Sequence, residues 1–158
     1  MSFRKEHKII TDDYLTDPQL IKELGPFNTD PCCLDKMPWR TAKRMLTKKD
    51  NGLTSKWTGT VWLNPPYSKP LPWIERFIEH NNGIILVPGR SPETAWCQLL
   101  YEQADLFFYP RGRFEFFLKD GSPSAGKWQP NLLAAMGGTC VKRLLNLPRH
   151  GVYLERLR

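Results

Sequence analysis

The sequence contains no long apolar run. The longest, around Ile84–Val87, has the length of a strand, whereas a helix that crosses a bilayer needs about 20 apolar residues. The charged N-terminal residues 1–7 are not followed by an apolar stretch, so we predict neither a signal peptide nor a membrane anchor. These absences predict a cytoplasmic protein.

Cysteine and histidine are also scarce, with four cysteines and three histidines among 158 residues. Cys32 and Cys33 are adjacent, and no C-x-x-C pair or H-x-x-x-H spacing occurs. We therefore predict reduced thiols and no metal site. A chain of this length buries enough surface to fold as one domain without either, and we expect that domain at residues 13–158, after a basic N-terminal tail at residues 1–12.

Negative charge is in the minority: 23 Lys and Arg residues accompany 16 Asp and Glu residues, for a net charge of +7. An excess of positive charge favours a polyanionic partner without identifying it. A basic surface that only keeps the protein in solution is the alternative. A basic cluster in the weakly periodic segment 34–56 fits both interpretations; its members are Lys43, Arg44, Lys48 and Lys49.

Hydrophobic periodicity predicts alternating helices and strands. One helix begins at Thr16-Asp17-Pro18, with Thr16 as its N-cap, and ends at Gly25-Pro26. A second covers residues 72–80, and Ser91-Pro92-Glu93 begins a third. The predicted strands are 60–63, 83–88, 104–109, 113–117 and 132–136. The fully apolar strand 83–88 is typical of a sheet covered on both faces, so we predict an α/β fold whose sheet is mostly parallel with an antiparallel end.

The tetrapeptide Asn64-Pro65-Pro66-Tyr67 directly follows the apolar strand 60–63. Ligands of open α/β sheets bind outside the carboxyl ends of the strands, which is where this segment is expected to lie. A proline-rich loop that merely ends a strand is the alternative, but the position of this one favours a catalytic role.

The residue types suit the transfer of a methyl group to an aromatic amine. The lone pair of an exocyclic amino nitrogen is delocalised into its ring, so the nitrogen is a poor nucleophile. The side-chain oxygen of Asn64 and the carbonyl of Pro65 can accept its two hydrogens and localise the lone pair. Pro65 and Pro66 donate no N–H and keep the loop stiff. Tyr67 can stack on a base flipped out of a duplex.

An ordered set of landmarks supports this interpretation. It consists of Tyr14-Leu15-Thr16-Asp17-Pro18, Phe27-Asn28-Thr29-Asp30-Pro31-Cys32, Pro38-Trp39-Arg40-Thr41-Ala42, Asn51-Gly52-Leu53 followed by Trp57, Val61-Trp62-Leu63-Asn64-Pro65-Pro66-Tyr67-Ser68, Pro72-Trp73 and Arg111-Gly112-Arg113-Phe114. With these landmarks the chain resembles the phage-type DNA N-6-adenine methyltransferases, small Dam-like enzymes of phages and prophages, from about Asp13 to Gly137.

The resemblance implies a compact, Rossmann-like class I methyltransferase fold. It also implies S-adenosylmethionine as cofactor, adenine in double-stranded DNA as acceptor, and no metal requirement. The glycine-rich loop usual in such folds is absent, and Asp30-Pro31-Cys32 resembles its reduced counterpart. Asp30 is therefore expected to meet the polar part of the cofactor, although a cap or turn residue is the alternative. Thr16 resembles a cofactor-contacting threonine of the family, and an N-cap explains it nearly as well.

The family often has Asp-Gly-Leu where this chain has Asn51-Gly52-Leu53, preceded by Asp50. The sequence leaves open which of Asp50 and Asn51 faces the adenosine. Strand ends on the expected ligand side carry candidate DNA-binding residues, namely Arg90, Arg111, Arg113 and Lys127. Each is equally well explained as a solvated surface charge, and Trp128 beside them fits core packing better than base stacking.

Several rival functions remain at this stage. RNA adenine, the N4 of cytosine or a protein glutamine amide could be methylated with the same tetrapeptide, although the net charge of +7 argues against a protein acceptor. A catalytically dead DNA-binding relative would be expected to have lost the tetrapeptide, which is intact here. The prediction is a DNA (adenine-N6) methyltransferase.

Overall fold

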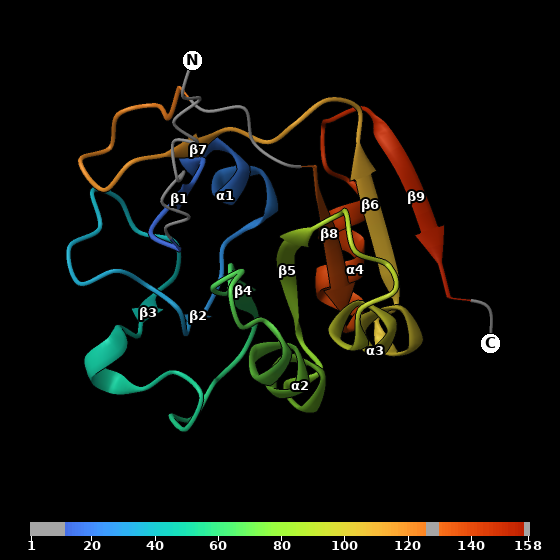
Figure 1. Ribbon diagram of the computed structural model, residues 1–158, viewed down its shortest axis with the longest axis horizontal. Coiled ribbons are helices and arrows are strands. Elements are labelled where there is room, and N and C mark those ends of the chain that lie inside the picture. The colour runs from blue at the N-terminus through green and yellow to red at the C-terminus, as the bar shows by residue number, and fades with distance from the viewer. Residues whose placement is uncertain (1–11, 126–129, 157–158) are drawn as a thin grey trace, which may run out of the picture.

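The computed structural model describes residues 12–125 and 130–156, and these form an α/β domain built on a mixed seven-stranded sheet (Figure 1). Its helices and strands, in chain order, are β1 (Leu15–Thr16), α1 (Pro18–Leu24), β2 (Thr29–Asp30), β3 (Arg44–Met45), the 3-10 helix η1 (Lys48–Asp50), β4 (Val61–Leu63), α2 (Leu71–His80), β5 (Gly83–Pro88), α3 (Ala95–Gln103), β6 (Leu106–Pro110), β7 (Phe116–Phe117), β8 (Asn131–Met136), α4 (Gly138–Leu145) and β9 (Gly151–Glu155). The predicted α/β class is confirmed.

The seven strands lie in the order β3-β2-β4-β5-β8-β6-β9. The pairs from β3 to β5 are parallel, and the pairs β5–β8, β8–β6 and β6–β9 are antiparallel. The antiparallel ladders join six, three and five residue pairs, whereas the parallel ladders join two, one and three. The prediction of a mostly parallel sheet was therefore wrong, because β8, which is as long as β5, runs in the reverse direction between β5 and β6.

Side chains that alternate along the central strands fill a core on each face of the sheet. Ile84 and Leu86 of β5 enter one core, and Ile85 and Val87 enter the other. Helices α1 and α4 cover the first face, and α2 and α3 cover the second. Burying an aliphatic side chain of this size contributes roughly 1.5–3 kcal/mol to the free energy of unfolding. The central strands therefore supply much of the stability of the domain, and their ends are held rigidly.

Two helix starts differ from the sequence prediction. The N-cap of α1 is Asp17, whose carboxylate accepts a hydrogen bond from the backbone N–H of Gln19, so Thr16 is left for another role. Helix α3 begins at Ala95 rather than at Ser91. The carbonyl of Ser91 accepts from both the backbone N–H and the hydroxyl of Thr94, which closes a turn ahead of the helix.

The periodicity analysis missed or misjudged several elements. Helix α4 and strands β1, β3 and β9 were not predicted. The predicted strand 113–117 is reduced to β7, which pairs with β1 in a separate two-stranded sheet. The predicted N-terminal tail lies outside the described residues except for Asp12. Within the described part of the chain no helix is long and apolar enough to cross a membrane, and the four cysteines are free thiols.

Candidate active site

The site lies where the order of the strands reverses. From β2 the chain moves outward to β3, then returns to the other side of β2 with β4 and continues to β5. The carboxyl ends of β2 and β4 therefore face a crevice from which the connections diverge, which is the usual ligand position in open α/β sheets. Asp30 ends β2 and Asn64 follows β4, so the fold brings together two residues that are 34 positions apart in the chain.

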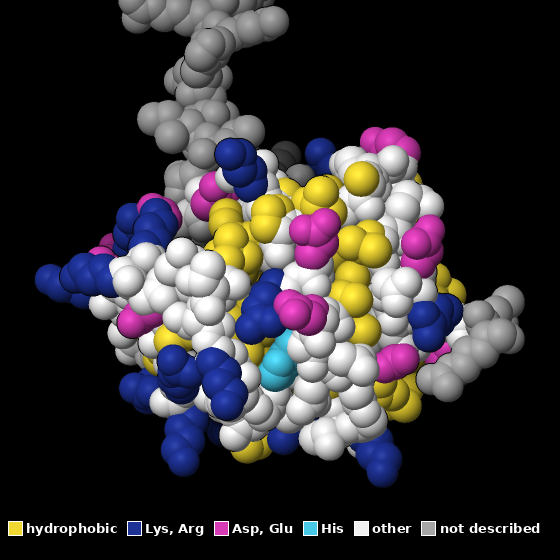
Figure 2. Space-filling view, turned by 90° about the horizontal axis from the view of Figure 1, so that it is seen from below, with side chains coloured by type: hydrophobic (Ala, Val, Ile, Leu, Met, Phe, Trp, Pro, Cys, Tyr) yellow, Lys and Arg dark blue, Asp and Glu magenta, His cyan; other side chains and the backbone are white. Residues whose placement is uncertain are grey.

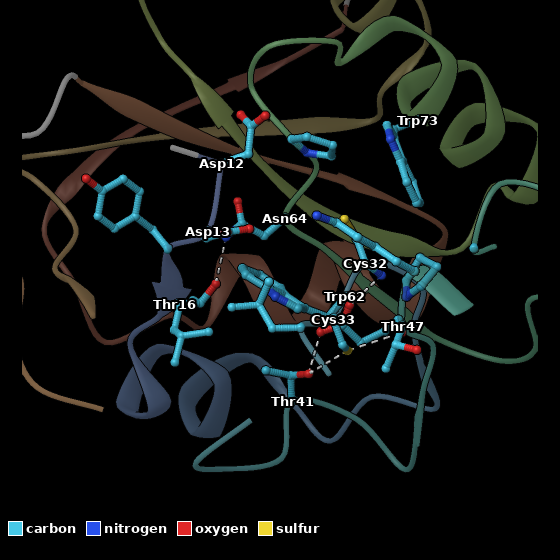
Figure 3. Close-up of a pocket in the computed structure, with 18 of the residues that line it drawn as sticks. Asp12, Asp13, Thr16, Cys32, Cys33, Thr41, Thr47, Trp62, Asn64 and Trp73 are labelled. Atoms are coloured by element: carbon cyan, nitrogen blue, oxygen red, sulfur yellow. Dashed lines mark hydrogen bonds between the residues drawn. The ribbon is translucent and has the colours of Figure 1, made fainter. Parts of the chain in front are cut away.

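A cavity of about 470 Å³ occupies this crevice. Its lining residues come from five parts of the chain that are distant in sequence, and they include Asp12 to Thr16, Asp30 to Leu34, Asn51 to Leu53, the three residues Trp62, Asn64 and Pro66, and the pair Pro72 and Trp73. Three carboxylates, of Asp12, Asp13 and Asp30, share it with an apolar wall. Figure 3 shows Asn64 beside Asp13 and Thr16 on one side of the cavity, with Trp73 reaching in from α2 on the other.

Asn64 is held by a hydrogen bond to Thr16. Its amide nitrogen donates to the hydroxyl oxygen of Thr16 over 3.2 Å, and Thr16 is only 3% exposed (Figure 3). The bond uses the amide nitrogen, so the side-chain oxygen of Asn64 is left to accept hydrogens from a bound group. Thr16 was predicted as a cofactor contact or an N-cap; it is not the N-cap, and it lines the cavity while holding Asn64.

The carbonyls of Pro65 and Pro66 differ in their hydrogen bonding. The carbonyl of Pro66 accepts from the backbone N–H of Lys69 and closes a turn, whereas the carbonyl of Pro65 has no hydrogen bond among the described residues. Beyond the prolines, the carboxylate of Asp12 accepts from both the backbone N–H and the hydroxyl of Ser68, at 3.2 and 2.6 Å. The loop is therefore fixed at both ends, and one carbonyl beside Asn64 is available.

Tyr67 does not line the cavity, and it is anchored by a residue that the sequence analysis missed. Its hydroxyl oxygen accepts a hydrogen bond of 2.8 Å from the amide nitrogen of Asn131, the first residue of β8. Burial raises the pKa of this hydroxyl, so it stays protonated at neutral pH. The signal for Asn131 was present in the sequence, since it is the one polar residue in the strand Asn131–Met136.

Asp30 is 4% exposed and makes hydrogen bonds within the chain. One carboxylate oxygen accepts from the backbone N–H of Cys32 over 3.0 Å, and the other accepts from the hydroxyl of Thr41. Desolvation raises the pKa of Asp30, and these hydrogen bonds offset part of the increase. Burial, assisted by the charge of Asp30, also raises the pKa of Cys32 to about 12, so this cavity-lining cysteine is a neutral thiol.

The structure separates the roles of Asp50 and Asn51. The carboxylate of Asp50 accepts from the backbone N–H and the hydroxyl of Thr47 and caps η1, and these bonds lower its pKa. Asn51 follows with a left-handed backbone (φ 48°) and lines the cavity. Gly52 then packs so closely on Pro31 that an added Cβ would collide with the Pro31 carbonyl. Of the two candidates, Asn51 is the one at the cavity.

The candidate DNA-binding residues lie near the same edge of the sheet. Arg90 and Arg111 are exposed and follow the carboxyl ends of β5 and β6. Arg113 is exposed two residues further along, in the connection that crosses the top of Figure 1 from β6 to β7. Lys127, and Trp128 beside it, lie outside the described residues. The structure thus brings the three described arginines to the edge that carries Asn64.

The basic residues of segment 34–56 form a flank of the molecule. Lys43, Arg44, Lys48 and Lys49 are exposed, and only Lys48 lines the cavity. Figure 2 shows Lys and Arg side chains gathered at this flank, on the face opposite the carboxyl ends of the parallel strands β2, β4 and β5. In the described part of the chain, no three His, Cys, Asp or Glu side chains come together as a metal site.

A cavity at the switch point of the sheet, beside an Asn-Pro-Pro-Tyr loop, places the protein in the class of open-sheet α/β domains. The chain belongs to the family described as DNA N-6-adenine-methyltransferase (Dam), whose profile matches residues 12–136. That match runs from the cavity-lining Asp12 to the end of β8, so it includes the whole crevice described above.

Two curated phage proteins are similar to part of the chain. A DNA N-6-adenine-methyltransferase of Haemophilus phage HP1 is 31% identical over 88 residues, which cover 52% of this chain and 50% of that protein. A protein of the same description from Escherichia phage T1 is 31% identical over 81 residues, 42% of this chain and 34% of that protein. The chain thus spans half or less of the length of these relatives. No solved structure matches it.

Proposed function

We propose that the protein methylates the N6 amino group of adenine in double-stranded DNA and uses S-adenosylmethionine as methyl donor. The observation that carries the proposal is the bond from the amide nitrogen of Asn64 to Thr16, which leaves the Asn64 oxygen to accept at the cavity. Family membership and the names of the two phage relatives support the acceptor. The switch-point topology supports a Rossmann-like class I fold.

The cavity suits this cofactor in size and chemistry. Its volume of about 470 Å³ falls in the range of small-molecule sites. Apolar side chains of Met37, Leu53 and Trp73 suit the adenine ring, and the carboxylates of Asp12, Asp13 and Asp30 suit a ribose or an ammonium group. Asn51 and Pro31 complete the polar and apolar borders expected around the adenosine.

S-adenosylmethionine, when bound, would supply a methyl group on a sulfonium sulfur: the electron pair of the S–CH3 bond would stay on the sulfur, which becomes a neutral thioether, and the amino nitrogen that gains the methyl group would release one proton to water. The oxygen of Asn64 and the carbonyl of Pro65 accept the two amino hydrogens of the adenine. Accepting both localises the nitrogen lone pair, and holding the nitrogen in place removes much of the entropic cost of the encounter. The chain contributes positioning and electrostatics.

Tyr67 supports the flipped base. Its ring is half-buried while its hydroxyl is fixed by Asn131, which leaves a stiff aromatic surface beyond Asn64. Arg90, Arg111 and Arg113 at the same edge suit phosphate contacts, which would carry most of the affinity for a duplex. The origin of both relatives in phages supports a phage or prophage source and action in the cytoplasm of a bacterial host.

One experiment tests the proposal directly. The protein is expressed in a host that lacks DNA methylation, and modified bases are mapped by single-molecule sequencing beside an Asn64→Ala control. We expect N6-methyladenine with the wild type and none with the variant. Modified cytosine in DNA, modified adenine only in RNA, or an unmodified genome would each overturn the proposal.

A further inference from the structure

Strand β8 has a polar residue where the sheet's core would accept an apolar one. Asn131 is 4% exposed and begins a strand whose other members, Leu132 to Met136, are all apolar. It is paired with Pro88 at the carboxyl end of β5, so it lies at the edge that carries the active site. A buried amide in this position costs stability unless its bonds are satisfied.

The hydrogen-bonding groups of the Asn131 side chain are only partly satisfied. The amide nitrogen of Asn131 donates to the hydroxyl of Tyr67 over 2.8 Å and to the carbonyl of Val87 over 3.4 Å. The side-chain oxygen is buried and has no partner among the described residues. Since the Val87 carbonyl can only accept, the nitrogen must face it, and this fixes the orientation of the amide. Tyr67 is therefore an acceptor in this bond.

The hydrogen bond from Asn131 determines the position of the Tyr67 ring. Tyr67 is held at one end by the stiff Pro65-Pro66 backbone and at the other by its hydroxyl, which is fastened to a residue of the central sheet. A ring restrained at both ends loses little further freedom when a base stacks on it. We propose, on the basis of the function above, that Asn131 is a positioning residue that acts through Tyr67 to place the acceptor base.

The test is a double-mutant cycle on the full-length protein. Asn131→Leu removes the donor with a similar shape, Tyr67→Phe removes the hydroxyl, and the third variant carries both. Steady-state kinetics with an adenine-containing duplex give kcat and KM, and calorimetry gives the Kd for S-adenosylmethionine. Thr60→Val is the matched control, because Thr60 is also buried and hydrogen-bonded, to Asn28, but lies at the opposite end of β4.

We expect each single substitution to lower kcat roughly 10- to 100-fold, the scale of a misplaced reacting group, with cofactor Kd changed less than threefold. The kcat of the double variant should be no lower than that of the less active single variant, because both substitutions remove the same hydrogen bond. Thr60→Val should keep its kcat. If Asn131→Leu does not fold, as judged by circular dichroism, Tyr67→Phe tests the same bond alone.

The outcomes separate the two proposals. If the wild type methylates adenine and either Asn131→Leu or Tyr67→Phe keeps kcat within threefold, the positioning role is wrong and the proposed function stands. Losses that multiply in the double variant, or that fall on cofactor Kd, also overturn the positioning role. If the wild type transfers no methyl group to adenine in DNA, the proposed function fails and the role of Asn131 fails with it.

Discussion

The amide of Asn64 is oriented by Thr16, which lies 48 positions earlier in the chain. Thr16 is in turn held in β1, where it is paired with Phe116 of β7. The residue proposed to hold the acceptor amine therefore depends on a two-residue ladder outside the main sheet. This dependence makes the contribution of each partner measurable.

Asn64→Ala is expected to abolish methyl transfer, because alanine has no side-chain oxygen to accept a hydrogen bond from the amino group of the adenine. The affinity for S-adenosylmethionine should stay within a few-fold, since Asn64 occupies one side of a cavity that many segments line. Tritium transfer and calorimetry measure the two quantities separately. Near wild-type transfer by the variant would show that the mechanism is wrong.

Thr16→Val is expected to lower kcat by about 10- to 100-fold, because it keeps the shape of the side chain and removes the oxygen that receives the Asn64 amide. Thr16→Ser keeps the oxygen and should retain most of the activity. Kinetics with saturating cofactor distinguish the two possible roles of Thr16. A loss confined to the KM for cofactor would assign Thr16 to cofactor binding instead.

Asp30→Asn is expected to raise the melting temperature of the cofactor-free protein at neutral pH. Burial raises the pKa of Asp30, so its protonated form is favoured by folding; the favourable contribution is full below the unfolded pKa of about 3.9 and is lost as pH rises through the folded value. The amide removes the buried charge; its oxygen can accept from the backbone N–H of Cys32, and its nitrogen can donate to the hydroxyl oxygen of Thr41, which reverses the direction of that bond. Melting curves from pH 4 to pH 8 should show the gain shrinking toward pH 4, and a gain independent of pH would contradict this cause.

The same Asp30→Asn variant tests the proposed contact with the cofactor. Losing a charge-assisted hydrogen bond should weaken S-adenosylmethionine binding by about 1.5–3 kcal/mol. Calorimetry at pH 7.5 measures this. An unchanged Kd would assign Asp30 only to the turn that it forms with Cys32 and Thr41.

Gly52→Ala is expected to destabilise the protein and weaken cofactor binding, because the new Cβ collides with the Pro31 carbonyl and pushes apart two cavity walls. Gly138→Ala is the matched control, since Gly138 begins α4 with nothing within 4 Å of an added Cβ. The control should be neutral or stabilising by up to about 1 kcal/mol. Thermal melts with and without S-adenosylmethionine report both effects, and equal behaviour of the two variants would refute the packing argument.

DNA affinity is expected to fall steeply with salt, and Arg90→Ala and Arg111→Ala should each reduce the slope of log K against log salt by about 1. Lys142→Ala is the control, because Lys142 is exposed on α4, and this helix starts beside the amino end of β5, at the opposite end of the sheet from Arg90 and Arg111. Fluorescence anisotropy between low and physiological salt measures the slopes. Unchanged slopes for both arginine variants would remove them from the DNA interface.

The sequence predicted the structure best where the local pattern of apolar residues and prolines matches the position of the segment in the folded domain. The apolar run before Asn64 and the two prolines after it determine both a buried strand and its end, so the position of the motif was predictable. The inner face of α1, with Leu20, Ile21 and Leu24, follows from helical spacing and is buried as expected.

Tertiary partners explain the remaining differences. The N-cap of α1 is Asp17 because Thr16 is held by β7 and Asn64. The role of Asn131 depends on its hydrogen bond to Tyr67, which lies 64 positions away in the chain, so the local sequence does not predict it. Strand β9 was missed because it is an edge strand with exposed Val152 and Leu154, so it lacks the alternation of a half-buried strand. Helix α4 has Gly137 as its N-cap and Gly138 as its first residue, without a side-chain cap, so its start carries no local signal.

The reversed direction of β8 has a consequence for how this domain can vary. Because β6 and β8 are antiparallel neighbours, the connection between them leaves and rejoins the sheet at the same edge, the one that carries Asn64 and Arg111. Doubling the length of such a loop costs only about 0.6 kcal/mol in closure entropy. Additional base-reading surface can therefore be inserted in this connection, outside β7 and its pairing with β1, without altering a strand pair and at the edge where the base would be modified.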